Sequence, residues 1–541
     1  MPVDVEDTAT DSNGFNRHAR TVTLMTLLSR ATGLVRDGVL SRLFGAGTLM
    51  SAFFFAFMIP NLFRRLFGEG ALAAAFLPTY ATLHRDRPDV ARAFAAVTVA
   101  LLAVFLGVIT FIAELALGIG VWLLDRDTLA LELMMIMLPY MPLVCLVAVL
   151  GAMLQVRGRF GPTAAAPIVL NLMIVLTAIC CAVLLKPDGI EDGEQSARMH
   201  VMLIAMSVIL AGMIQLAWSL AAVGERGWLR ARSTEVREHV RTMIRMAGPM
   251  ILSLGVLQLN TFFDGVIASY PVTFATDAFF GFKVPMDDQS MAVISFAQRL
   301  YQFPLGVFGI AVATAIFPAL ARLASDEQAF RNTLQRGIRL VVFIGLPASA
   351  GLILVRSSLT SVIFAGGEFT AEDTERVARV LLGYAPAIWA YSLTHVLTRA
   401  FYARGDSKRP VGVAVWMVGL NIVLNLTLIN FLGEAGLAWS TSICATLQAL
   451  LLMHIFQRHH IRSIVDREVV KSVVWSMILT TLMTGAVVGA TLALGALSEA
   501  DWTSAILLLI VQATSGMLAY AAAAYFTRPA ELRWALGSEQ D

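Results

Sequence analysis

Four arginines lie inside stretches of sequence that are otherwise apolar: Arg30, Arg36, Arg64 and Arg299. A guanidinium group is planar and offers paired N–H donors, which match the oxygens of a phosphate or a carboxylate. Few acidic residues stand near these arginines in the sequence, and this favours a dianionic phosphate as their ligand. The alternative is a set of ion pairs between helices. The use of arginine is itself weak evidence, because the chain has only 4 lysines against 36 arginines.

Two acidic residues accompany these arginines. Asp37 directly follows Arg36, and successive side chains on a helix point about 100° apart, so we do not expect the two to be simply each other's partner. We group Asp37 with the four arginines as a candidate substrate-binding residue. Glu69 stands four residues after Arg65, which is the spacing of an ion pair on one helix face, and this pair is a candidate gate.

The composition shows what surrounds these charges. Of the 541 residues, 57% are apolar and only 14% are charged, and the mean hydropathy is +0.73. Soluble domains carry about 25% charged residues, so a soluble enzyme, a nucleic-acid binder and a disordered scaffold are excluded. The four cysteines lie in apolar runs without metal-ligand spacing, so we expect no metal site.

Fourteen segments reach the length of about 20 mostly apolar residues that a membrane-spanning helix needs. They are 22–45, 50–78, 93–121, 129–156, 163–186, 199–223, 244–270, 290–321, 334–364, 377–402, 410–432, 435–457, 472–496 and 502–527. The connections between them are short, which leaves no room for a separate soluble domain. We therefore expect an all-α integral membrane protein.

The charges of the connections alternate along the chain. Every even-numbered connection is basic, and every odd-numbered one is acidic or neutral. The sixth connection, for example, carries Arg226, Arg230, Arg232, Arg237, Arg241 and Arg245, whereas the fifth carries Asp188, Glu191, Asp192 and Glu194. Basic loops stay on the cytoplasmic side of a membrane, so both termini are predicted to be cytoplasmic.

The chain also contains an internal repeat. The run Ala71–Pro78 is similar to Ala311–Pro318 at an offset of 240 residues, and Arg157-Gly158 is similar to Arg404-Gly405 at an offset of 247. This offset spans six helices, so the two halves share one topology, and transporters commonly bind their substrate between such repeats. Chance similarity between alanine-rich helices is the alternative.

The repeat and the charges together predict a domain organisation. The predicted parts are a polar cytoplasmic N-terminus (1–20), a first six-helix lobe (21–224), a basic linker (225–243), a second six-helix lobe (244–457), another basic linker (458–471), two further helices (472–527) and a cytoplasmic tail (528–541).

Several motifs resemble those of one known family, the MurJ/MviN lipid II flippases of the multidrug/oligosaccharidyl-lipid/polysaccharide exporter superfamily. The motifs are Ser29–Asp37, Phe54–Ala71, Phe296–Val307 and Tyr402–Pro410. The resemblance implies two pseudo-symmetric six-helix lobes and two C-terminal helices that form a groove for a lipid tail. It also implies that Arg30, Arg36, Arg64 and Arg299 line a cationic cavity, with Asp37 tied to function.

Two positions depart from the family pattern. Ser51 and Gln298 stand where the family often has aspartate, which puts in doubt an ion-pair gate that uses those acids. Some members resemble sodium-binding transporters, and here Asp264, Asn421 and Asn425 could supply oxygen ligands. Asn421 and Asn425 share one helix face, and hydrogen bonds between helices are the alternative reading of this group.

The resemblance predicts a flippase that moves lipid II, the undecaprenyl-pyrophosphate-linked peptidoglycan precursor, across the bacterial cytoplasmic (inner) membrane by alternating access. No bond is made or broken, so no catalytic residue and no cofactor are expected, and the transport would be coupled to Na⁺ or to the membrane potential. Membrane lipids and the cell-wall synthesis machinery are the expected partners. Rival readings are a polysaccharide-lipid flippase or a drug/cation antiporter of the same superfamily, and a membrane enzyme acting on polyprenyl lipids.

Overall fold

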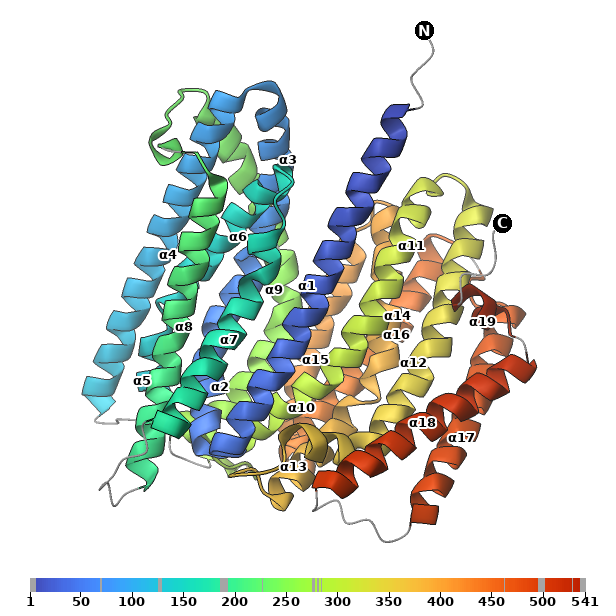
Figure 1. Cartoon of the computed structure of the whole chain (residues 1–541). Helices are drawn as coiled ribbons and strands as arrows, with labels where there is room; N and C mark the ends of the chain where they lie inside the picture. Colours follow the sequence, from blue (N-terminus) through green and yellow to red (C-terminus); the bar gives the residue numbers. More distant parts are fainter. Residues whose placement is uncertain are drawn as a thin grey trace. The chain divides into compact units, whose positions relative to one another are not determined.

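The computed structural model describes residues 6–68, 71–124, 129–184, 193–225, 227–274, 278–279, 282–283, 285–461, 463–494, 502–527 and 529–535. Almost all of them are helical (Figure 1). Within this described part, eleven helical segments are long and apolar enough to cross a membrane. The prediction of an all-α, multi-span membrane protein is therefore confirmed.

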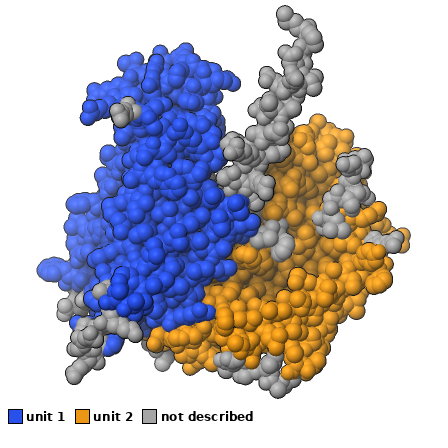
Figure 2. Space-filling model, in the orientation of Figure 1, with its two compact units in different colours: residues 1–275 blue, residues 276–541 orange. Residues whose placement is uncertain are grey.

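The chain divides into two compact units, residues 1–275 and residues 276–541 (Figure 2). The elements of unit 1 are α1 (Glu6–Phe44), α2 (Thr48–Phe63), η1 (Arg64–Gly68), α3 (Ala71–Asp86), α4 (Pro88–Leu124), α5 (Leu129–Met137), α6 (Tyr140–Val156), α7 (Gly161–Leu184), α8 (Gly193–Val223), η2 (Trp228–Arg230) and α9 (Val236–Phe274).

Unit 2 holds the remaining elements. They are β1 (Ala278–Phe279), β2 (Phe282–Lys283), α10 (Ser290–Pro304), η3 (Leu305–Gly309), α11 (Ile310–Arg322), α12 (Glu327–Phe364), α13 (Ala371–Tyr384), α14 (Ala387–Ala403), α15 (Lys408–Leu432), α16 (Ala435–His459), α17 (Arg467–Leu494), α18 (Trp502–Thr527) and α19 (Ala530–Ala535). The two short strands pair antiparallel and were not predicted.

Each of the fourteen predicted spans corresponds to a helix or to a broken helix. The second span consists of α2, η1 and α3, and the eighth consists of α10, η3 and α11. The fourth and the tenth are each divided at a proline, Pro139 and Pro386. Hydropathy does not reveal these breaks, because the residues on both sides of them are equally apolar.

The boundary between the units differs from the predicted one. The helix α9 packs against α2, α3 and α4 of unit 1, and its Met243 is buried beside Thr98 of α4. The seventh span therefore belongs to the first compact unit by contact. That it begins the second lobe of the repeat, at residue 244, stays a prediction. The physical reason for the contact is that α9 presents an apolar stripe, which includes Val240 and Ala247, to its neighbours.

The structure supports the internal repeat through matching irregularities. The segments η1 and η3 are both π-helical, and each separates two helices of one span. The helices α6 and α14 have the same length and lie 247 residues apart. Each is capped by an arginine, and the glycine after that arginine, Gly158 or Gly405, has left-handed backbone with φ of 72°. In both cases the residue after the glycine donates a backbone hydrogen bond to the carbonyl oxygen five residues earlier, as in a Schellman motif.

The last two long helices, α17 and α18, pack on each other and on α12 (Figure 1). Their contact with α12 includes polar side chains: Ser358 Oγ donates to Gln512 Oε1 at 2.6 Å, and the Tyr520 hydroxyl donates to the carbonyl oxygen of Phe343 at 2.6 Å. Large apolar side chains such as Phe526, which is 82% exposed, cover their outer surface. This is the surface expected of helices that face lipid.

A cluster of charged residues joins two connections of unit 2 to the helix α13. The guanidinium of Arg376 on α13 donates to both carboxylate oxygens of Glu434, each at 3.0 Å, and to Asp287 Oδ1 at 2.9 Å. Burial acts to raise the pKa of Asp287, but the hydrogen bond and the charge of Arg376 outweigh burial, so this pKa is lowered from its ordinary value of 3.8. The cluster ties the start of α10 to α13 and to the α15–α16 turn.

The lowered pKa of Asp287 predicts a pH dependence of stability. A carboxyl whose pKa is lowered in the folded state contributes stability above its ordinary pKa, and this contribution is lost as the pH falls through the folded value. On acidification from about pH 7 to about pH 3, the thermal midpoint of the wild type should therefore fall more than that of Asp287→Asn. Midpoints that fall in parallel for the two proteins would contradict this role of Asp287.

Candidate functional site

Arg36 and Asp37 form a buried ion pair in the C-terminal third of α1. Their exposed fractions are 7% and 1%. Arg36 Nε and Nη2 donate to Asp37 Oδ1 at 2.9 and 2.6 Å. The two residues are therefore direct partners, although not simply each other's, because Arg36 also donates to Asn171. Their Cβ atoms diverge as predicted, but the long arginine side chain bends back and brings its guanidinium to the neighbouring carboxylate.

A third residue completes this group. Arg36 Nη1 donates to Asn171 Oδ1 at 3.1 Å, and Asn171 lies on α7. The amide nitrogen of Asn171 in turn donates to the carbonyl oxygen of Ser29 at 3.2 Å and to Thr32 Oγ1 at 3.1 Å, one turn earlier on α1. Asn171 thus cross-links α7 to α1 and orients the guanidinium. The sequence analysis missed this role, although an asparagine in an apolar run was the available signal.

Arg64 is the first residue of the π-helical segment η1. Its Nε and Nη2 donate to Asn61 Oδ1 at 3.2 and 2.9 Å, so the guanidinium lies along its own helix. Tyr140, the first residue of α6, is fully buried within unit 1. π-helical turns of this kind are frequent at functional sites.

Arg65 points to a different helix. Its Nη1 donates to Gln258 Oε1 on α9 at 3.1 Å. The predicted ion pair of Arg65 with Glu69 stays a prediction, because Glu69 lies outside the described residues. Arg30 is half-buried on α1, between the helix start and Arg36.

Arg299 stands half-buried on α10 of unit 2, whereas Arg30, Arg36 and Arg64 belong to unit 1. That all four arginines share one cavity stays a prediction. The neighbour Gln298 donates to the hydroxyl of Tyr384 at 3.0 Å. Ser51, the other departure from the family pattern, is fully buried in α2.

The candidate cation ligands are distributed over both units. Asp264 is buried on α9 of unit 1, and Asn421 and Asn425 are buried on α15 of unit 2. The Asn425 amide donates to Asn421 Oδ1 at 2.9 Å, the Asn421 amide donates to Ser440 Oγ on α16 at 3.2 Å, and Ser440 Oγ donates to Asn425 Oδ1. The two asparagines therefore form hydrogen bonds between helices, which was the alternative reading. That the three residues bind a cation together stays a prediction.

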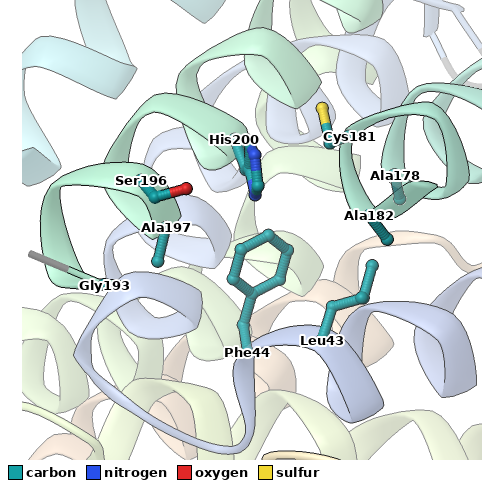
Figure 3. A pocket seen from close by; sticks show the side chains of 9 residues that line it. All are labelled: Leu43, Phe44, Ala178, Cys181, Ala182, Gly193, Ser196, Ala197 and His200. Atoms are coloured by element: carbon teal, nitrogen blue, oxygen red, sulfur yellow. The ribbon is translucent and has the colours of Figure 1, made fainter. Parts of the chain in front are cut away.

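A cavity of about 330 Å³ lies elsewhere in unit 1, where the end of α1 meets α7 and the start of α8. Figure 3 shows that Ser196 and His200 supply its polar groups among small apolar side chains such as Ala178 and Ala182. None of the predicted site residues lines this cavity. No group of three or more potential metal ligands is found in the part of the chain that the structure describes.

A family model described as "Lipid II flippase MurJ" matches residues 40–512. The chain belongs to the MurJ family. A MurJ relative from Vibrio cholerae, named a probable lipid II flippase, is 34% identical over 450 residues, which cover 80% of this chain and 81% of that protein. The relative from Haemophilus influenzae, named in the same way, is 30% identical and covers 79% of this chain and 83% of its own length.

Solved structures agree with this MurJ assignment at the level of the fold. A lipid II flippase MurJ in an inward closed conformation has a TM-score of 0.73 at 20% identity and covers 94% of this chain and 99% of that chain. An inward-facing multidrug resistance MATE family transporter of the MOP superfamily has a TM-score of 0.61 at 15% identity, covering 81% of this chain and 95% of that chain. Both solved structures thus share the fold of this chain.

The role of Asn171 in this MurJ family member can be tested by its removal. Asn171→Ala takes away the hydrogen-bond partner of a buried guanidinium, so we expect the free energy of unfolding to fall by about 2 kcal/mol. Asn430→Ala is the matched control, because Asn430 is exposed and bonds only within α15; we expect a change below about 0.5 kcal/mol. Thermal or chemical unfolding in detergent measures both, and equal values for the two variants would refute the cross-link.

Proposed function

We propose that this chain flips lipid II from the cytoplasmic to the outer leaflet of the bacterial inner membrane. The observation that carries the proposal is a match to the lipid II flippase family that runs along most of the chain, together with arginines held inside its helices. Flippases move a lipid without making or breaking a covalent bond. The residues of the site therefore need to bind and release an anionic head group, and no nucleophile or general base is required.

Arg36 and Arg64 are arranged to receive such a head group. Burying an arginine in a membrane costs about 2.5–3.5 kcal/mol, and here hydrogen bonds to Asp37, Asn171 and Asn61 offset that cost. These partners orient each guanidinium, and a phosphate could take the place of some of them. A pyrophosphate can then accept hydrogen bonds from both arginines. Arg30 and Arg299 complete the proposed binding set.

Transport requires the site to open to each side of the membrane in turn. In transporters, structural repeats that are related in this way commonly move against each other as rigid bodies around the substrate. We propose this alternating-access movement for the two lobes. The membrane potential, which is negative inside, would draw the unloaded cationic site back toward the cytoplasm, at about 2.3 kcal/mol per 100 mV for each full charge.

Transport could be coupled to Na⁺ or to the membrane potential, and the hydrogen bonds of Asn421 and Asn425 favour the membrane potential. The amide oxygens of Asn421 and Asn425 already accept hydrogen bonds from Asn425 and Ser440. A cation at this position would have to compete with both bonds for these oxygens. We further propose that both termini are cytoplasmic, as the basic even-numbered connections indicate, and that the chain works beside the cell-wall synthesis machinery.

A drug/cation antiporter of the same superfamily is the alternative function. Such a protein needs acidic residues to attract its substrate, whereas Asp37 is occupied by Arg36 and the other residues of the proposed site in unit 1 are arginines. The similarity to the MATE transporter is also limited to the fold at 15% identity.

Complementation tests the function directly. In bacteria depleted of their own lipid II flippase, expression of this chain should restore growth and the appearance of lipid II on the outer leaflet, measured with a reagent that cannot cross the membrane. If the chain is abundant in the membrane and lipid II stays inside, the proposed function is wrong.

Two substitutions test the cationic site in the same assay. Arg36→Ala and Arg299→Ala should each abolish complementation at normal expression, because each removes a donor pair for the pyrophosphate. Arg85→Ala is the control, since Arg85 is exposed and pairs only with its neighbour Asp86. Full activity of both Arg36→Ala and Arg299→Ala would rule out the cationic-site mechanism.

A further inference from the structure

One face of α14 is only partly buried, and its residues are polar. They are Tyr391, His395, Thr398, Arg399 and Tyr402, which we call the α14 stripe. Their spacing of three and four residues places them on the same side of the helix. Other side chains of α14, such as Leu393, Val396 and Leu397, are buried and apolar. The polar side is thus the one that the rest of unit 2 leaves uncovered.

The α14 stripe does not have the composition of a lipid-facing surface. Helices of unit 2 that face outward expose large apolar side chains, such as Trp416 on α15 at 77% and Leu492 on α17 at 74%. Polar and charged groups cost free energy when they contact the hydrocarbon of a membrane, and the apolar residues on these outward-facing helices avoid that cost. The adjacent helix α11 exposes small residues, including Ala311, Thr314 and Ala315. Together the two helices form a face suited to water and a polar ligand.

The internal repeat shows that the fold does not require these polar residues. The helices α6 and α14 correspond at an offset of 247 residues, and both begin after a proline and end at an arginine. At the positions of Tyr391, His395 and Arg399, the helix α6 carries Val144, Ala148 and Ala152, whereas at the position of Tyr402 it carries the polar Gln155. The corresponding helix thus has no ionisable side chain at these positions. The architecture therefore does not dictate His395 and Arg399.

The geometry of Arg399 restricts what it can bind. Its guanidinium carbon lies 5.3 Å from the centre of the Phe317 ring on α11. A ring that covers one face of a guanidinium leaves the N–H donors at its edge directed outward in the plane. Such an edge matches the two oxygens of a carboxylate. The imidazole of His395, one turn earlier, and the hydroxyl of Tyr402 add hydrogen-bonding groups on the same side of α14.

We propose that the α14 stripe binds the saccharide and peptide portion of the lipid-linked substrate, with Arg399 engaging a carboxylate and the tyrosines and His395 contacting the sugars. This assignment rests on the proposed function and deepens it. Sugars present hydroxyl groups and apolar ring faces, which match phenol and imidazole side chains. The stripe has a single guanidinium, so it is less suited to a pyrophosphate than the arginines of unit 1.

A comparison of two ligands distinguishes binding of the saccharide and peptide from binding of the pyrophosphate. Dissociation constants of lipid II and of undecaprenyl pyrophosphate, which lacks sugars and peptide, would be measured with the purified full-length chain. Arg399→Ala and His395→Ala should each weaken lipid II binding by about tenfold, as expected for a lost polar contact. Binding of undecaprenyl pyrophosphate should change by less than about twofold. Arg399→Lys, which keeps the charge and loses the planar fork, should weaken lipid II binding in the same sense.

Controls keep the outcomes distinct. Arg379→Ala removes an exposed arginine of α13 that pairs with Glu375, and it should leave both constants unchanged. His395→Gln keeps a hydrogen-bonding group and covers the case in which His395→Ala does not fold. Unchanged lipid II binding in the stripe variants, or an equal loss for both ligands, would overturn the assignment. If the wild type itself does not bind lipid II, the proposed function fails first, and the assignment falls with it.

Discussion

A guanidinium group inside a membrane protein must find hydrogen-bond partners or water, and much of unit 1 is organised around this constraint. Arg36 is held by Asp37 on its own helix and by Asn171 on α7. Asn171 returns two hydrogen bonds to α1, so the same contact that stabilises the charge also joins the two helices. The same hydrogen bonds therefore fix both the position of the charge and the packing of α1 against α7.

The two halves of the chain apply a common architecture to different chemistry. Both contain a span interrupted by a π-helical segment and a span divided at a proline. Unit 1 places its predicted arginines on α1 and η1, whereas unit 2 carries Arg299 on α10 and the polar face of α14. The repeat provides similar helices on both sides, and the differences between corresponding residues show where each half is specialised.

The sequence predicted the spans, the repeat and the family, because hydropathy, loop charge and the motifs depend on local runs of residues. It did not predict contacts that depend on how a flexible side chain bends or on which neighbour a helix selects. The partnership of Arg36 with Asp37 is an example, since the helix geometry that separates their Cβ atoms does not limit a side chain as long as arginine. The contact of α9 with α2, α3 and α4 is another, because it depends on packing between distant segments.

The π-helical segments have a further consequence for how the chain tolerates change. A π turn accommodates one residue more than an α turn, so every side chain after η1 or η3 is rotated by about 100° from where a continuous helix would place it. In unit 2 this rotation sets the direction in which α11 presents Phe317 to Arg399. The two halves of each broken span are thus rotated relative to each other about the helix axis, by an angle that the π turn sets. A deletion of one residue there would turn the whole following half-helix, which is a far greater change than any single substitution within it.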